Sequence, residues 1–296
     1  MTIRVLCMGE LMWDFHVPLG QSLVSTSDFH RVAGGAAANV ACHLTSCDVR
    51  CAVGGVVSRD TLGQALCEDL EARGIDISTV QRAAGRTGLV FIEQVRPEEL
   101  RVVSYPPRYD EPTEHYPLPK DFECQAAAVL YIAAVAPDEV KLGALTEAAG
   151  RTREAGGRVV LDLNARSHAW RHHSLDAAAT KLIAQADLVK ASRGDLAVLG
   201  IPDGRHLGQL LRSGASAVVT DGSNPVQLLS PQGGLSFEPP GLSARRSLGA
   251  GDAFDAGMIY RLLDGPWPQS QAVWREVLSQ GYDQAAKHMT AATGPA

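Results

Sequence analysis

The sequence predicts an α/β fold in which helices cover both faces of a mainly parallel sheet. From about residue 129 onward, short uninterrupted apolar runs alternate with helical stretches, and this alternation is typical of parallel strands buried on both faces. Residues 89–92 and 100–105 break the pattern, because they are β-rich runs joined by a polar, proline-containing turn, as in an antiparallel pair. We therefore expect one α/β core, residues 1–12, 34–85 and 113–296, and a small β appendage, residues 13–33 and 86–112.

The elements of the first half follow from short apolar runs and the residues that bound them. Gly34 and Gly35 lead into a helix built of small side chains, which indicates close packing on a neighbour. A later amphipathic stretch is closed by Gly74, as helices often are. The predicted elements are strands at 3–8 and 52–57 and helices at 36–44 and 61–73.

The second half continues the alternation of strand and helix. Here the apolar runs are continuous, and no internal repeat or low-complexity linker separates them. Strands are predicted at 129–134, 159–162, 187–190, 217–220 and 226–229. Helices are predicted at 138–154, 177–186, 205–213, 253–263 and 270–292, the last open to a break at Gly281.

Composition and charge exclude several classes of protein. A hydrophobic content of 45% is ordinary for a soluble globular chain, and the longest apolar run, residues 126–136, is too short to cross a bilayer. A formal net charge of −6 gives no support for binding nucleic acid or an anionic membrane. Since no charged-then-apolar leader opens the sequence, we expect a cytoplasmic protein.

The six cysteines all lie in the first half of the chain. Cys42, His43, Cys47 and Cys51 form a short cluster, but their spacing does not match paired metal-ligand motifs. We therefore expect reduced thiols, Cys124 included, rather than a zinc site.

The loop Gly249-Ala250-Gly251-Asp252 is the strongest candidate for chemistry. Small residues leave its backbone N–H groups accessible, and a helix follows, so the loop is suited to bind an anion. Asp252 beside such an anion hole could take a proton from an attacking hydroxyl. Asp is also a favoured helix N-cap and Gly-x-Gly a common tight turn, so a structural explanation stays open at this point.

Four motifs occur in order along the chain, and together they resemble one family. They are residues 9–14 (GELMWD), 34–41 (GGAAANVA), 160–166 (VLDLNAR, followed by Trp170) and 249–252 (GAGD). This set resembles the ribokinase-like carbohydrate kinases, the PfkB family, and is closest to its fructokinase and 2-keto-3-deoxygluconate kinase branch. The match covers nearly the whole chain. It implies a three-layer sandwich with a small β-sheet lid, here residues 13–33 and 86–112, over the sugar.

The resemblance also implies a role for each matching residue. Asp252 would deprotonate the accepting hydroxyl, and the amides of Gly249, Ala250 and Gly251 would receive the transferring phosphoryl group. The substrate would be held by Asp14, Gly34, Gly35, Asn39, Asn164 and Arg166. The nucleotide would border Ser192, Thr220 and Gly222, and Asp195 would help to hold Mg²⁺ through water. Taken singly, each residue has an ordinary structural explanation, and their joint order is what favours the functional one.

Three departures from the family pattern fall on the phosphate-donor side. Arg246-Ser247 stands where the family has Asp-Thr before its Gly-Ala-Gly-Asp, which puts monovalent-cation activation in doubt. Ser192-Arg193-Gly194-Asp195 replaces Asn-x-x-Glu, and its shorter carboxylate changes how magnesium would be placed. Pro225 stands where a glycine is common in the nucleotide loop.

The resulting expectation is an enzyme that uses ATP and Mg²⁺ to phosphorylate a hydroxyl of a small sugar or sugar acid, similar to fructose or ketodeoxygluconate. No Walker-type Gly-x-x-x-x-Gly-Lys loop is present. Two alternatives stay open: a nucleoside kinase of the same family, and a sugar- or nucleotide-binding homologue with weakened catalysis. An exposed lid edge could also pair two copies into a homodimer.

Overall fold

The protein is described by a computed structural model that covers residues 2–18, 20–96, 99–110, 117–118, 128–133, 136–167, 169–171, 173, 175–240 and 248–290. Three residues that entered the sequence argument, Cys124, Arg246 and Ser247, lie outside these ranges. What the sequence predicts for these three residues therefore stays a prediction.

A nine-stranded sheet forms the centre of the molecule. Its order is β15 (Gly233–Phe237), β14 (Asn224–Ser230), β13 (Ser216–Asp221), β12 (Leu188–Ser192), β11 (Arg158–Asp162), β10 (Val129–Ala133), β1 (Val5–Met8), β4 (Cys51–Ser58) and β5 (Asp76–Ala83). The strands from β13 to β5 run parallel, whereas β14 and β15 are antiparallel additions at one edge. The predicted, mainly parallel sheet is confirmed.

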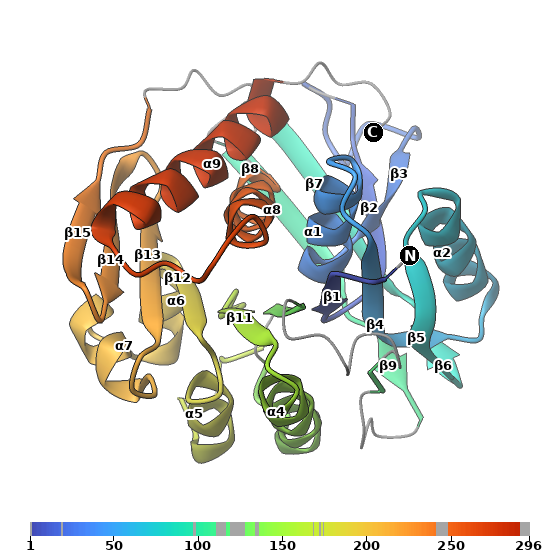
Figure 1. The fold of residues 1–296 in the computed structure, drawn as a ribbon. Helices are drawn as coiled ribbons and strands as arrows, with labels where there is room; N and C mark the ends of the chain where they lie inside the picture. The colour runs from blue at the N-terminus through green and yellow to red at the C-terminus, as the bar shows by residue number, and fades with distance from the viewer. Residues whose placement is uncertain are drawn as a thin grey trace.

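Helices cover this sheet on both faces (Figure 1). One layer holds α1 (Ala36–Thr45), α2 (Thr61–Ala72), α8 (Ala250–Leu262) and α9 (Gln271–Thr290). The other holds α4 (Glu139–Glu154), α5 (Ala177–Ile183), α6 (Arg193–Leu199) and α7 (Gly204–Leu210). Because side chains alternate along a strand, Val5 and Cys7 pack into the first apolar core and Leu6 and Met8 into the second. The three-layer α/β fold expected from the sequence is present.

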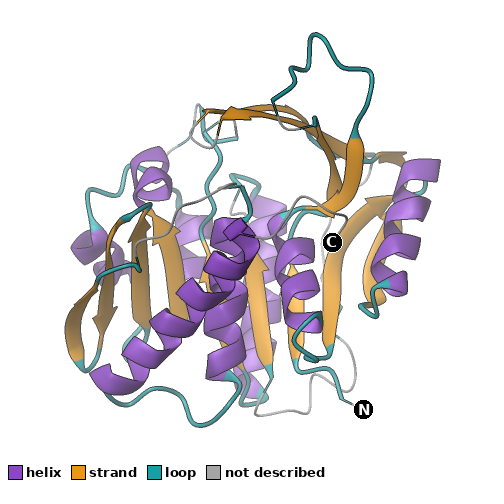
Figure 2. Ribbon diagram, turned by 90° about the horizontal axis from the view of Figure 1, so that it is seen from above, coloured by secondary structure: helices purple, strands orange, loops and turns teal. Residues whose placement is uncertain are grey.

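A smaller four-stranded sheet arches over the ends of strands of the main sheet (Figure 2). Its order is β3 (His30–Gly34), β2 (Met12–His16), β7 (Gly88–Arg96) and β8 (Glu99–Tyr105). Strands β7 and β8 are antiparallel, as predicted, whereas β2 and β7 pair in parallel. Two short strands, β6 (Gly85–Arg86) and β9 (Arg108–Tyr109), pair separately beside it.

Some elements differ from the sequence prediction. Strands β5 and β15 were not expected, because both lie at sheet edges and lack a continuous apolar run. The short helix α6 was also missed, and α7 ends at Leu210 rather than at residue 213. Helix α9 continues through Gly281 without a break. A Cβ at that position would lie 2.8 Å from ring carbons of Phe254, so this glycine lets α8 and α9 cross closely.

The cysteine thiols of the described chain are free, namely Cys7, Cys42, Cys47, Cys51 and Cys67. Burial raises the pKa of Cys7 well above its ordinary value, with smaller contributions from Cys51 and Cys42. Within the described ranges, no group of three or more His, Cys, Asp or Glu side chains is placed to hold a metal ion. In the same ranges, no helix has the length and apolar character that a membrane span requires.

Candidate active site at the N-terminus of α8

The first turn of α8 carries the Gly-Ala-Gly-Asp motif. Gly249 is the N-cap of this helix, with a left-handed backbone at φ 79°, and no side chain caps the helix there. Asp252 lies in the first turn and is not the cap, which removes the simplest structural explanation for it. Since the first N–H groups of a helix have no partner inside that helix, this end of α8 is a place where negative charge is stabilised.

Helix α1 brings Asn39 to the Asp252 carboxylate. The Nδ2 group of Asn39 donates a hydrogen bond of 2.8 Å to Oδ2 of Asp252, although the two residues are 213 positions apart. Gly35 caps α1 at φ 92°, and a Cβ at this position would clash with the backbone oxygen of Glu10. The Gly34-Gly35 pair therefore lets the start of α1 approach the loop after β1 closely.

A second carboxylate, Asp14 of β2, belongs to the same site. Its carboxyl group lies directly against Gly34, where any side chain would collide with it. Burial raises the pKa of Asp14 from 3.8 to about 7; the negative charge of Asp252 adds to this effect and Arg166 opposes it. The strand β2, the end of β3 and the loop after β11 thus converge on Asp252.

Beneath the Gly-Ala-Gly loop lies a buried charge cluster formed by Asp162, Lys190, Asp255 and Tyr131. The Lys190 ammonium donates to Oδ2 of Asp162 over 3.0 Å and lies 3.8 Å from Oδ2 of Asp255. The Tyr131 hydroxyl donates to Oδ2 of Asp255 over 2.9 Å. A Cβ built on Gly251 would lie 3.5 Å from the Lys190 Nζ, so this fixed positive charge sits directly under the loop.

The acid and base strengths in this cluster follow from burial and mutual charge. Burial works to lower the pKa of Lys190, but the charges of Asp162 and Asp255 outweigh it and hold that pKa above its ordinary value. Burial raises the pKa of Asp255 well above its usual range, with Lys190 opposing the shift. Burial thus favours the protonated form of Asp255, and the Lys190 charge favours its ionised form.

Sequence reasoning missed Lys190, Asp255 and Tyr131 as parts of the site. A signal for two of them was present, because Lys190 and Asp255 are charged residues inside elements that the pattern predicts to be buried. Asp162 was included in a motif without a role, and the structure pairs it with Lys190. What could not be read from the sequence is that these residues meet under Gly251.

The loop after β11 carries the next two predicted residues. Asn164 is buried and has a left-handed backbone at φ 37°, a conformation that asparagine tolerates better than most residues. Its N–H donates to Oδ1 of Asp162 over 3.3 Å. Arg166 is exposed and lies close enough to Asp14 to lower that residue's pKa. Arg166 therefore lies near Asp14, whereas Asn164 lies beside Asp162 of the buried charge cluster.

The residues predicted to contact the nucleotide lie at the adjoining ends of β12 and β13. Ser192 caps α6, and together with Asp195 it forms a reciprocal capping box. Asp195 also accepts a hydrogen bond of 2.7 Å from the Ala165 amide, so it ties the loop after β11 to α6. Thr220 pairs with Ser192 across the two strands. Gly222 follows in the β13–β14 turn at φ 60°, with open space where a side chain would be.

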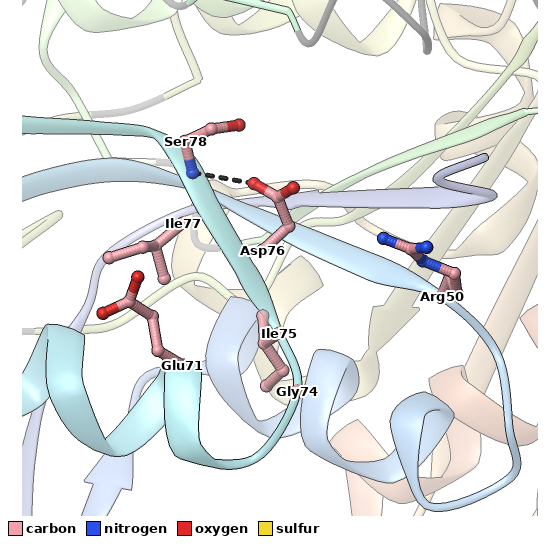
Figure 3. A pocket seen from close by; sticks show the side chains of 7 residues that line it. All are labelled: Arg50, Glu71, Gly74, Ile75, Asp76, Ile77 and Ser78. Atoms are coloured by element: carbon pink, nitrogen blue, oxygen red, sulfur yellow. Dashed lines mark hydrogen bonds between the residues drawn. The ribbon is translucent and has the colours of Figure 1, made fainter. Parts of the chain in front are cut away.

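A surface hollow of about 440 Å³ lies elsewhere on the molecule (Figure 3). It is lined by Arg50, Glu71, Gly74, Ile75, Asp76, Ile77 and Ser78. These residues surround the beginnings of β4 and β5. In contrast, Asp14 lies in β2, which follows the end of β1, and Asp162 is the last residue of β11. The hollow therefore lies where the parallel strands begin, and the candidate active site lies where they end.

Comparison with known proteins decides the family. A sequence model described as pfkB family carbohydrate kinase matches residues 2–274. The chain belongs to this family. It is accordingly a phosphotransferase, a kinase of the sugar and nucleoside class.

Several relatives within the pfkB family are recognisable at low identity. Aminoimidazole riboside kinase of Salmonella typhimurium is 26% identical over 242 residues, which cover 80% of this chain and 75% of that protein. The 2-dehydro-3-deoxygluconokinase of Bacillus subtilis is 27% identical over 282 residues, covering 90% and 85%. Fructokinase from Vibrio cholerae, solved with fructose, ADP and calcium bound, superposes with a TM-score of 0.79 at 21% identity, covering 97% and 93%. This last likeness establishes the fold.

Proposed function

We propose that the protein transfers the terminal phosphoryl group of ATP to a hydroxyl of a small sugar or sugar acid, with Asp252 as the general base. The observation that carries this proposal is the place of Asp252 in the first turn of α8, bonded to Asn39 and close to Asp14. In-line transfer requires positioning, charge neutralisation and one base. Asp252 takes the proton of the attacking hydroxyl, while the amides of Gly249, Ala250 and Gly251 stabilise charge on the phosphoryl oxygens.

The substrate-binding residues in this proposal are Asp14, Gly34, Gly35, Asn39, Asn164 and Arg166. The missing side chains at Gly34 and Gly35 leave room for the Asp14 carboxyl and for the close approach of α1, so that both can face a sugar, and an amide such as Asn39 can both donate and accept. In the same proposal the four-stranded sheet is the lid, formed by residues 13–33 and 86–112. Closing it would exclude water from the phosphoryl group.

On the donor side, Ser192, Thr220 and Gly222 would border the nucleotide. The fit of Asp195 to a magnesium role can be judged from its hydrogen bonds. Its Oδ2 accepts from both the amide and the hydroxyl of Ser192, whereas among the described residues Oδ1 accepts from the Ala165 amide only. A carboxylate oxygen has two lone pairs, so Oδ1 can still hold a metal-bound water. When bound, Mg²⁺ would neutralise charge on the ATP phosphates.

A nucleoside kinase is a second candidate within the family. It is favoured by the 26% identical relative, which is named as a riboside kinase. Catalytic weakening is a third candidate. It is motivated by the departures from the family motifs at Ser192, Asp195 and Arg246, although the Gly249–Asp252 motif argues against it.

The test is a panel of acceptors assayed for Mg²⁺-dependent ADP release from ATP. Fructose, ketodeoxygluconate and aminoimidazole riboside or other nucleosides are compared side by side, with and without potassium. Fastest turnover on a sugar or sugar acid supports the first proposal, whereas preference for a riboside supports the nucleoside kinase. Ligand binding without turnover on any acceptor would instead support the weakened homologue.

We also propose that a second copy of the chain pairs with the outer face of the lid. Phe91, Val103 and Tyr105 lie on the face opposite to Asp14, since residues of one strand alternate between faces. Val103 is 43% exposed and Tyr105 54%. Pairing of two such faces would remove these apolar side chains from water.

A further inference from the structure

Helices α8 and α9 cross one another in the fold (Figure 1). At this crossing, the C-terminal end of α9 contacts the loop that precedes α8. The Nε2 atom of His288 lies 2.7 Å from the carbonyl oxygen of Leu248, 40 residues earlier. A carbonyl oxygen can only accept a hydrogen bond, so Nε2 carries the proton and donates. His288 had no role in the family motifs, and tertiary packing alone brings it to this loop.

This hydrogen bond determines which way the Gly249 amide points. The carbonyl of Leu248 and the N–H of Gly249 belong to one trans peptide unit, in which the two groups point in opposite directions. Holding the Leu248 oxygen toward α9 therefore turns the Gly249 N–H away from α9. The ring of His288 also lies directly against Gly249, because a Cβ added there would be 2.8 Å from the same Nε2 atom.

Helix α1 also packs against His288. The ring of His43 lies edge-on to that of His288, with centroids 5.1 Å apart and an interplanar angle of 79°. His43 is four residues after Asn39, so both side chains project from one face of α1. The same helix face thus contacts Asp252 through Asn39 and the histidine that holds the Gly249 peptide.

We propose that His288 is a positioning residue for phosphoryl transfer, and that it acts by fixing the direction of the Gly249 amide in the anion hole. This inference rests on the proposed function of the α8 loop. Amides of an anion hole act mainly on charge that develops in the transition state, whereas the proposed sugar contacts come from β2, α1 and the loop after β11. Loss of the His288 donor should therefore lower kcat and leave the KM for the sugar nearly unchanged.

The experiment compares His288→Leu with His288→Gln, whose side-chain N–H reaches about as far as Nε2. Lys287→Leu, at the exposed neighbouring position of the same helical turn, is the control. We expect His288→Leu to lower kcat at least about 10-fold, because removing an anion-hole donor outright costs about 100-fold or more. The KM for the sugar should change less than about 2-fold, Gln should restore most of the rate, and Lys287→Leu should match the wild type.

A readout that needs no turnover is the ¹H–¹⁵N NMR signal of the Gly249 amide. It should shift in His288→Leu and stay near the wild-type position in His288→Gln. An unchanged signal in the leucine variant overturns the proposal, as does equal loss of kcat in the Leu and Gln variants or an effect confined to KM. If the wild type phosphorylates no acceptor, the proposed function fails, while the Gly249 signal still decides whether His288 orients the amide.

Discussion

Asp252 accepts a hydrogen bond from Asn39 and lies at the positive end of α8, so an amide donor and the helix dipole both face its carboxylate. Replacing it with asparagine keeps an oxygen that can accept from Asn39 and removes the base. We expect Asp252→Asn to leave the sugar dissociation constant nearly unchanged and to lower kcat by ~10²-fold or more. Calorimetry and a coupled ADP assay measure the two quantities.

The matched control for this variant is Asp283→Asn, an exposed aspartate on α9. It should have wild-type kcat. Near-normal turnover by Asp252→Asn would contradict the assignment of Asp252 as the base.

Asp14 makes a prediction about stability. Its pKa is raised from 3.8 to about 7, mainly by burial and next by Asp252, with Arg166 opposing. The folded state therefore holds a proton that the unfolded state has released, so this group's favourable contribution is complete below pH 3.8 and is lost as the pH rises to about 7. Above about pH 7 the folded protein holds this buried carboxyl in its charged form, which costs free energy. Asparagine carries no charge, so Asp14→Asn should raise the free energy of unfolding at pH 8 by at most about 4 kcal/mol.

Thermal melting of the ligand-free wild type and Asp14→Asn from pH 4 to pH 8 checks this prediction. The two proteins should melt at similar temperatures at pH 4 and diverge as the pH rises, with the variant more stable. A larger advantage for the variant at pH 4 than at pH 8 would refute the sign of the shift.

At the scale of elements, α8 and α9 cross through two glycines. A Cβ at Gly281 would lie 2.8 Å from the Phe254 ring, and one at Gly257 would clash with the Gln280 carbonyl oxygen. The crossing matters for the site because α8 carries Asp252 and α9 carries His288. The glycine that the sequence pattern marked as a break is thus a contact point between two helices.

We expect Gly281→Ala to lower the free energy of unfolding by about 1–3 kcal/mol, as overpacked core positions do. Gly143→Ala is the matched control, since Gly143 is exposed within α4 and has nothing within 4 Å of an added Cβ. Alanine there should stabilise the protein by roughly 0.5–1 kcal/mol through helix propensity. Urea denaturation measures both variants, and effects of the same sign would contradict this account of the crossing.

At the scale of the whole molecule, the outer face of the lid is where we expect a second copy to bind. Val103→Lys places a charge among Phe91 and Tyr105 and should convert a dimer to a monomer, because burying an unpaired charge is costly. Light scattering measures the molar mass. Val140→Lys, at a 47% exposed valine on α4, is the control and should leave the mass unchanged. A monomeric wild type would exclude the proposed pairing.

The sequence by itself determined the fold class, and it named the residues from which the candidate site is proposed. Apolar runs at 129–134, 159–162 and 187–190 predicted buried parallel strands, because burial on both faces needs an unbroken apolar pattern. Gly34, Gly35 and Gly249 could be singled out because glycines at the start of a helix leave backbone N–H groups accessible. Edge strands such as β5 were missed for the converse reason, since half-exposed strands carry no such pattern.

Tertiary structure alone decided which distant residues meet. The parallel pairing of β2 with β7, the Lys190 cluster under Gly251 and the contact of His288 with Leu248 each join segments far apart in the chain. A local pattern states that a residue is buried or turned, but not what lies against it. That information arises only when the helices and the two sheets pack, because packing brings together side chains that the sequence keeps apart.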